Sequence, residues 1–309
     1  MSSSPLPANA ATTAAVERRP RQRWTRFILP TYSWFVLLYV VFPITIVIVY
    51  AFNQSPTRLP QVVFRWQGFT LDWYRQIFDI PGLTPAFFLS LKIALTTAVM
   101  ATLLGTLIAL ALIRYRFFGK VAFEQLLFLN IAAPEIVMGA SLLGFFVTIQ
   151  SATGLHLLGF PGLLIAHVMF STAYVAITVR ARMSGFDRSM EEAAQDLGAT
   201  PFVTFQKVTL PLIWPGIAAG AVMAFALSID DYVVSSFVAG SRVTFPLWVF
   251  GASRVGIPPQ VFVLGTLIFM GGITLAVFSL ALQRRGTKPT LKARPSQVAT
   301  RALGRATTD

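Results

Sequence analysis

Three carboxylates of this chain lie within or at the end of strongly apolar segments: Glu135, Asp230 and Asp231. An ionisable side chain is costly inside a membrane, so each of the three is a candidate for a functional site. Carboxylates attract cations, and aromatic rings beside them add a modest cation–π attraction, for which Tyr232 and Phe237 are the candidates. These residue types predict a path through a membrane along which a cationic solute binds to the three carboxylates.

The alternative is that the carboxylates only stabilise the fold, either in water at a helix end or paired with Lys92. For Asp231 we favour this structural role. For Glu135 and Asp230 we favour the cation path, because Pro134 removes a backbone donor directly before Glu135. Broken helices of this kind are tolerated in a membrane where they line a cavity or pack within protein.

The depth of these two carboxylates follows from the helical rise. Glu135 lies fourteen residues past Val121, or roughly 21 Å along a straight helix, and Asp230 lies eighteen residues past Leu212, or about 27 Å. Since a bilayer core is about 30 Å thick, both are expected in the outer half of the membrane.

The composition of the chain is that of a membrane protein. Its 309 residues are 55% hydrophobic and only 12% charged, with a mean hydropathy of +0.68. A net charge of +13 would suggest a nucleic-acid partner in a soluble chain, but in a membrane protein the positions of the basic residues matter more. There is no cysteine, and His156 and His167 form no metal-binding pattern, so we predict neither a metal site nor a nucleic-acid partner.

The carboxylates are positioned by six apolar segments that are each long enough to cross a bilayer. They cover about residues 27–52, 85–113, 121–150 with an interruption at 132–135, 161–179, 212–230 and 260–282. We therefore expect an all-α polytopic membrane domain over residues 27–283, between basic tails at 1–26 and 284–309 that are predicted to be disordered.

The distribution of basic residues predicts the orientation of these segments. With both termini in the cytoplasm, nineteen of the 25 Lys and Arg residues fall on the inner side. Six spans therefore satisfy the positive-inside rule, which an odd number would break.

The charged interval 189–215 lies between two of the apolar segments. Ser189 and Glu192 have the spacing of a capping box, which predicts a helix that starts near Met190. Gly198 suits a left-handed helix end, and Thr200 followed by Pro201 suits the start of a second helix. The interval is rich in acidic residues, which an anionic lipid surface does not attract, so we expect it to contact a protein.

The same interval resembles a known motif. Glu192-Ala193-Ala194, Gly198 and Val208-Thr209-Leu210-Pro211 are spaced as in the EAA loop of ABC importer permeases. The resemblance implies that residues 181–211, hereafter the coupling loop, dock into a cleft on an ATPase subunit. It also implies that the coupling residues are Glu192, Ala193, Ala194, Gly198, Leu210 and Pro211.

Further segments are similar to the spermidine/putrescine branch of these permeases. They are Arg114–Phe117 with Gly119-Lys120, Pro134–Met138, Gly185–Asp187 and Leu227–Val238, and the resemblance extends over residues 27–285. It implies a type I ABC importer permease fold in a bacterial inner membrane, with a second permease subunit, ATPase subunits and an external solute-binding protein as partners. The implied cargo is a polyamine.

The energy source is expected on another chain. The sequence has no G-x-x-x-x-G-K-[ST] motif, so ATP and Mg²⁺ are predicted on the partner ATPase, and we expect no cofactor here. There is no nucleophile–base arrangement either, so the chain is predicted not to be an enzyme.

Two alternatives concern the function. A permease of the same family could carry another small solute, such as an amino-acid derivative, thiamine or a metal chelate. A secondary transporter would need no ATPase and commonly contains inverted repeats. The sequence shows no such repeat, and the coupling loop would have no purpose there.

Overall fold

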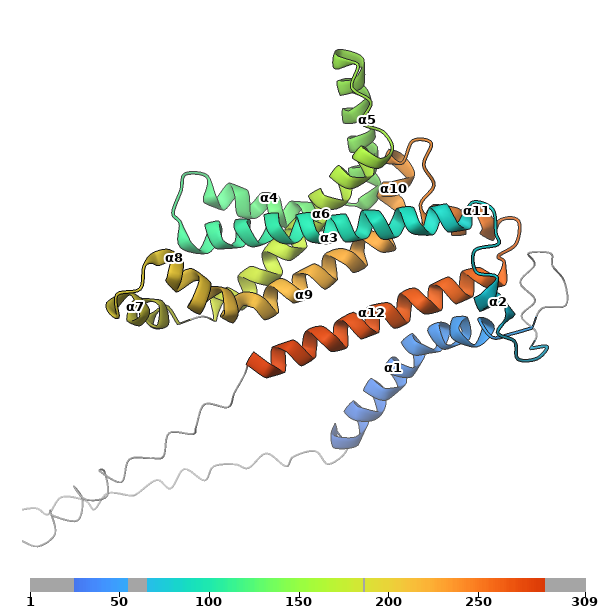
Figure 1. Ribbon diagram of the computed structural model, residues 1–309, viewed down its shortest axis with the longest axis horizontal. Helices are drawn as coiled ribbons and strands as arrows, with labels where there is room; N and C mark the ends of the chain where they lie inside the picture. Colours follow the sequence, from blue (N-terminus) through green and yellow to red (C-terminus); the bar gives the residue numbers. More distant parts are fainter. Residues whose placement is uncertain (1–24, 55–65, 186, 287–309) are drawn as a thin grey trace, which may run out of the picture. The chain divides into compact units, whose positions relative to one another are not determined.

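The computed structural model describes residues 25–54, 66–185 and 187–286, which form helices joined by loops (Figure 1). The chain divides into two compact units, Met1–Val49 and Tyr50–Asp309. In the first unit lies almost all of helix α1 (Thr25–Tyr50), which contains Pro30 and Pro43. Most of the two predicted tails lies outside the described residues.

The second unit contains the remaining helices. They are α2 (Asp72–Arg75), α3 (Leu83–Arg114), α4 (Lys120–Ala132), α5 (Glu135–Thr153), α6 (Phe160–Ser184), α7 (Ser189–Asp196), α8 (Pro201–Thr204), the π-helix η1 (Phe205–Thr209), α9 (Leu210–Ile229), α10 (Val233–Val238), α11 (Phe245–Ser253) and α12 (Pro259–Gly286). Within the described ranges, six helical stretches are long and apolar enough to cross a membrane. The prediction of an all-α chain with six spans is confirmed.

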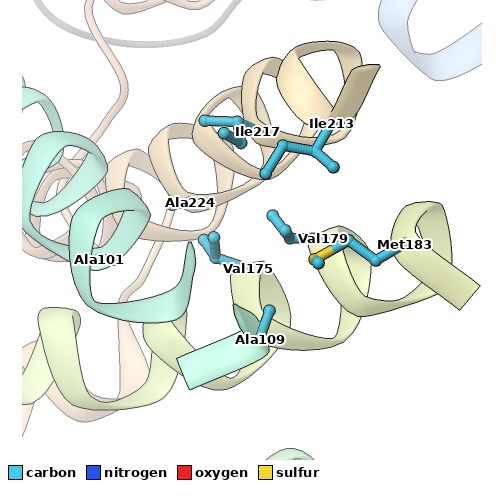
Figure 2. Close-up of a cluster of buried hydrophobic side chains, with 8 residues drawn as sticks. All are labelled: Ala101, Ala109, Val175, Val179, Met183, Ile213, Ile217 and Ala224. Carbon is cyan, nitrogen blue, oxygen red and sulfur yellow. The ribbon is translucent and has the colours of Figure 1, made fainter. Parts of the chain in front are cut away.

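Helices α3, α6 and α9 pack against one another through small residues. Figure 2 shows their shared core, which consists of Ala101 and Ala109 of α3, Val175, Val179 and Met183 of α6, and Ile213, Ile217 and Ala224 of α9. A Cβ atom on Gly105 of α3 would lie 2.7 Å from the Cβ of Val175, and one on Gly220 of α9 would lie 3.0 Å from its Cγ1. Because lipid does not drive apolar helices together, such close backbone approach is what stabilises helix pairs in a membrane.

The chain breaks at Ala133-Pro134, as the proline predicted, and forms two helices there. Pro134 has an extended backbone, and α5 leaves in a different direction from α4 (Figure 1). Helix α4 packs against α6, whereas α5 packs against α10, where Gly139 meets the ring of Phe237. Helix α4 ends at Ala132, so the change of direction falls just before Glu135, and the depth calculated for this residue stays a prediction.

The two ends of the bundle are built differently. Helix α7 contacts the end of α3 through Arg114, whereas the N–H of Phe245 in α11 donates a hydrogen bond to Ser90 Oγ near the start of α3 (2.8 Å). The coupling loop and α11 thus lie at opposite ends of α3, as Figure 1 shows. Helix α9 runs from the coupling loop to Asp230 at the other end of its 20 residues, a length of about 30 Å.

Candidate functional site

The coupling loop consists of two short helices with a turn between them. Helix α7 is followed by Gly198 with φ +85°, a left-handed conformation that glycine adopts without strain. Thr200 precedes α8, its Oγ1 accepts a hydrogen bond from the Val203 N–H (3.4 Å), and Pro201 is the first helical residue. The predicted helix end and second helix start are both confirmed.

The start of α7 differs from the predicted capping box. Arg188 occupies the cap position with helical backbone angles, so Ser189 is already inside the helix and makes no side-chain cap. Asp187 takes this role instead, because its Oδ1 accepts a hydrogen bond from the Ser189 N–H (3.0 Å). This hydrogen bond favours the charged carboxylate and lowers the pKa of Asp187 below its ordinary value.

A cluster of side chains attaches the coupling loop to the helices of the core. Glu191 in α7 forms an ion pair with Arg114 at the end of α3 and accepts a hydrogen bond from the hydroxyl of Thr209, the last residue of η1. Arg114 Nη2 also donates to Thr209 Oγ1 (3.1 Å), and Arg188 Nη2 donates to the carbonyl oxygen of Ile113 (3.1 Å). Sequence reasoning did not find this cluster, since no local signal connects Glu191 with a residue in α3.

The predicted coupling residues lie on both the exposed and the packed side of the loop. Glu192, Ala193, Gly198 and Pro211 are exposed, whereas Ala194 and Leu210 are half-buried. Two large apolar side chains add to the exposed side, Leu197 at 89% and Phe202 at 73% exposure. A surface with an acidic residue and exposed apolar side chains suits a protein partner better than an anionic lipid surface.

The predicted carboxylates lie together at the far end of α9. Glu135, Asp230 and Asp231 line one pocket of about 350 Å³ with residues of α4, α6 and α10; its polar and aromatic lining includes Asn130, Tyr174 and Tyr232. Glu135 and Asp230 are exposed. Lys92 instead lies with its Nζ 4.9 Å from the centre of the Phe160 ring, and among the described residues it forms no ion pair with these carboxylates.

A second pocket adjoins the first. It measures about 570 Å³ and is lined mostly by apolar residues of α11 and α12. It shares Asp230 and Tyr232 with the first pocket, hereafter the acidic pocket. The rings of Tyr232 and Phe250 lie 4.5 Å apart at its wall. Phe237, the other aromatic residue expected near the carboxylates, packs against Gly139 and lines neither pocket.

Asp231 is engaged in a buried network, and this differs from both structural roles considered for it, in water at a helix end or paired with Lys92. Its side chain is only 7% exposed, and its Oδ2 lies 3.4 Å from His167 Nε2 and accepts a hydrogen bond from the Ser235 N–H (2.8 Å). The sequence indicated no role for His167. In the part of the chain that the structure describes, no group of histidine and acidic residues could hold a metal ion.

Comparison with known proteins places these features in a context. Residues 101–289 match a family described as binding-protein-dependent transport system inner membrane component. The chain is 38% identical over 260 residues to the spermidine/putrescine transport system permease protein PotC of Haemophilus influenzae, covering 84% of this chain and 97% of that protein. It is 41% identical over 254 residues to PotC of Escherichia coli K12, with coverages of 82% and 92%.

A third relative has a related name, and solved structures share the fold. The putrescine transport system permease protein PotI of Escherichia coli K12 is 39% identical over 252 residues, covering 79% of this chain and 85% of that protein. A chain of a bacterial alginate ABC transporter, solved in complex with an alginate pentasaccharide-bound periplasmic protein, aligns with a TM-score of 0.61 at 18% identity. The alignment covers 87% of this chain and 96% of that one, and it shows a common fold.

Proposed function

The chain belongs to the family of binding-protein-dependent transport system inner membrane components, and we propose that it is a permease subunit of an ATP-driven importer of polyamines. As a multi-pass membrane protein of this family it supplies the path for the solute. Three relatives at 38–41% identity are named as permeases for spermidine/putrescine or putrescine, which supports the same cargo class here.

The observation that carries the cargo proposal is the position of Glu135 and Asp230 in one pocket beside an apolar one. A polyamine is a flexible chain in which ammonium groups alternate with methylene segments. Glu135 and Asp230 are exposed to the acidic pocket and suit the ammonium groups, while the wall formed by Tyr232 and Phe250 suits the methylene segments. Aromatic faces also attract ammonium groups, so the wall does not repel the cation.

The energy for transport comes, in this proposal, from a separate ATPase that holds ATP and Mg²⁺. The exposed side of the coupling loop, with Glu192 and Gly198, is the docking surface for that subunit. A second permease subunit and an external solute-binding protein complete the importer, and the chain has both termini in the cytoplasm.

The structure offers a physical route from the coupling loop to the pocket. Glu191 and Thr209 connect the loop to α9, and α9 ends at Asp230 in the pocket wall. Helix α9 is continuous over this length, with Pro215 inside it, so a displacement of the loop by the ATPase would be passed along α9 to its far end. That movement would change the distance between Asp230 and Glu135, which belongs to another helix.

Uptake of labelled spermidine by cells with and without this chain tests the proposal. The strain must lack other polyamine importers, and unlabelled putrescine, amino acids and thiamine serve as competitors. We expect uptake to disappear on deletion and to be reduced only by polyamine competitors. Uptake that is unchanged on deletion, or that amino acids or thiamine abolish, would contradict the polyamine assignment.

A further inference from the structure

We propose that His167 is a positioning residue for the cargo pocket: it holds Asp231 in the buried network, and thereby sets the place of the neighbouring Asp230. This inference rests on the proposed function, because it concerns the site that would bind the cargo. His167 does not line the acidic pocket, so its role would be exerted through other residues.

The ring of His167 joins three segments of the chain. It belongs to α6 and is 1% exposed. Its Nδ1 lies 2.7 Å from Ser228 Oγ in α9, and its Nε2 lies 3.0 Å from Ser235 Oγ in α10 and 3.4 Å from Asp231 Oδ2 between these helices. One side chain of α6 therefore connects the end of α9, the turn after it and the start of α10.

Asp231 depends on these contacts because it is buried. Its carboxylate accepts hydrogen bonds from the backbone N–H groups of Ser235 (2.8 Å) and Val234 (3.4 Å), which caps the start of α10. A buried carboxylate without sufficient partners is strongly unfavourable, so it would move toward water or take up a proton. The His167 ring supplies the side-chain partner that makes this buried position favourable.

The position of Asp231 determines that of Asp230. Consecutive Cα atoms are about 3.8 Å apart, so a fixed Asp231 leaves the backbone of Asp230 little freedom. Both residues line the pocket, but Asp230 is exposed, whereas the Asp231 side chain is buried and bound to the His167 network. The network thus assigns one of the two adjacent acids to the fold and leaves the other for the cation.

One tautomer of the His167 ring fits these contacts. With Nε2 protonated, the ring donates toward Asp231 and Ser235, and Nδ1 accepts a hydrogen bond from the Ser228 hydroxyl. At position 167, the amide nitrogen of a glutamine would lie roughly where Nε2 of the histidine lies. The amide nitrogen of an asparagine would reach only the place of Nδ1. Glutamine can therefore keep the contact with Asp231, which asparagine loses.

The experiment uses the complete importer, with its partner subunits, reconstituted in liposomes. Initial rates of labelled spermidine uptake over a range of concentrations give KM and Vmax for His167→Asn and His167→Gln. The matched control is Ser171→Ala, one turn along α6, since Ser171 is fully buried and its hydroxyl has no hydrogen-bond partner among the described residues. Thermal unfolding of each variant complex measures its stability.

We expect H167N to raise KM about tenfold or more, the effect of losing a hydrogen bond to a charged group. H167Q should stay within about threefold of the unmodified importer, because it keeps the contact with Asp231, and S171A should leave KM unchanged. A merely structural role would instead lower the amount of assembled importer or Vmax and leave KM as it is. Equal KM values for H167N, H167Q and the unmodified importer would overturn the proposal.

A double variant tests whether His167 acts through Asp230. If it does, H167N should raise KM much less in a D230N background than in the unmodified importer. The reason is that the effects of substitutions at two interacting residues are not additive. Full additivity of the two effects would overturn the proposal. If H167N does not assemble, Ser235→Ala takes its place, since it removes one partner of Nε2 and keeps both the His167 ring and the Asp231 carboxylate.

The outcome separates this inference from the cargo proposal. An unmodified importer that takes up a different solute and no spermidine would contradict the proposed cargo. The same variants would then be compared with that solute, and the expected order of KM values for H167N, H167Q and S171A would be unchanged.

Discussion

Arg114 at the end of α3 forms an ion pair with Glu191 in α7, although 77 residues separate them in the sequence. The next residue, Glu192, is exposed. Two adjacent glutamates thus face different surroundings: Glu191 binds to the permease itself, and Glu192 is free to contact a partner. The distinction matters because the two side chains are chemically identical and their roles can be compared directly.

The first prediction compares alanine substitutions of these two glutamates. Glu191→Ala should lower the unfolding free energy by about 1–2 kcal/mol, because it leaves the half-buried Arg114 without its carboxylate partner. Glu192→Ala should leave the unfolding temperature unchanged but reduce the amount of solute transported per ATP hydrolysed. The measurements are thermal unfolding of the purified complex, and ATP hydrolysis and uptake in the same liposomes. Equal unfolding temperatures of the two variants would contradict the assignment.

The second prediction concerns the turn at Gly198. Its φ of +85° costs about 1 kcal/mol for alanine but less for asparagine, which tolerates left-handed angles better. A Cβ atom there would meet no atom within 4 Å, so space inside the permease does not decide the outcome. If backbone conformation is the reason for the glycine, Gly198→Asn should couple ATP hydrolysis to transport better than Gly198→Ala. If Asn is as harmful as Ala or worse, the ATPase needs a flat surface at this position.

The sequence predicted those structural features that depend on residues close to one another in the chain. Six apolar segments, the break at Pro134 and the turn at Gly198 each follow from a short stretch of chain, and each is present. The capping box was wrong because the backbone at Arg188 is already helical, which residue types alone do not reveal.

What the sequence did not predict depends on pairs of distant residues. His167 lies 61 residues from Ser228 and 68 from Ser235, and only the packing of α6 against α9 and α10 brings them together. The direction in which α5 leaves α4 was not predicted either, since Pro134 indicates a break but not the angle between the two helices. The carboxylates themselves were found because an acid in an apolar segment is a local signal.

The third prediction tests the close approach of α3 and α6. Gly105→Ala places a Cβ atom 2.7 Å from the Cβ of Val175 and 2.9 Å from the Thr172 carbonyl oxygen, so the helices must separate. We expect a loss of about 1–3 kcal/mol in the unfolding free energy, as for other overpacked cores. Gly144→Ala in α5 is the matched control, because a Cβ there meets no atom within 4 Å and should not destabilise the protein. Equal unfolding temperatures of the two variants would contradict the packing.

The last prediction concerns the two carboxylates of the acidic pocket. Glu135→Gln and Asp230→Asn remove a negative charge with almost no change in shape, so assembly should be unaffected while the attraction for a cation falls. We expect the KM for spermidine uptake to rise about tenfold for each variant, since each removes a charge-assisted contact. Glu124→Gln is the matched control, because Glu124 is a carboxylate of α4 that pairs with Arg180 (3.0 Å) and does not line the pocket.

The cargo itself provides a further control for this prediction. Putrescine carries two ammonium groups and spermidine carries three, so either cargo can place an ammonium group against each of the two carboxylates. If each carboxylate contacts one ammonium group, its loss should raise the KM for spermidine and the KM for putrescine by similar factors. A larger factor for spermidine would mean that the carboxylates act through the general field of the pocket, because that attraction grows with the charge of the cargo. An unchanged KM for both cargoes would mean that Glu135 and Asp230 do not contact the cargo.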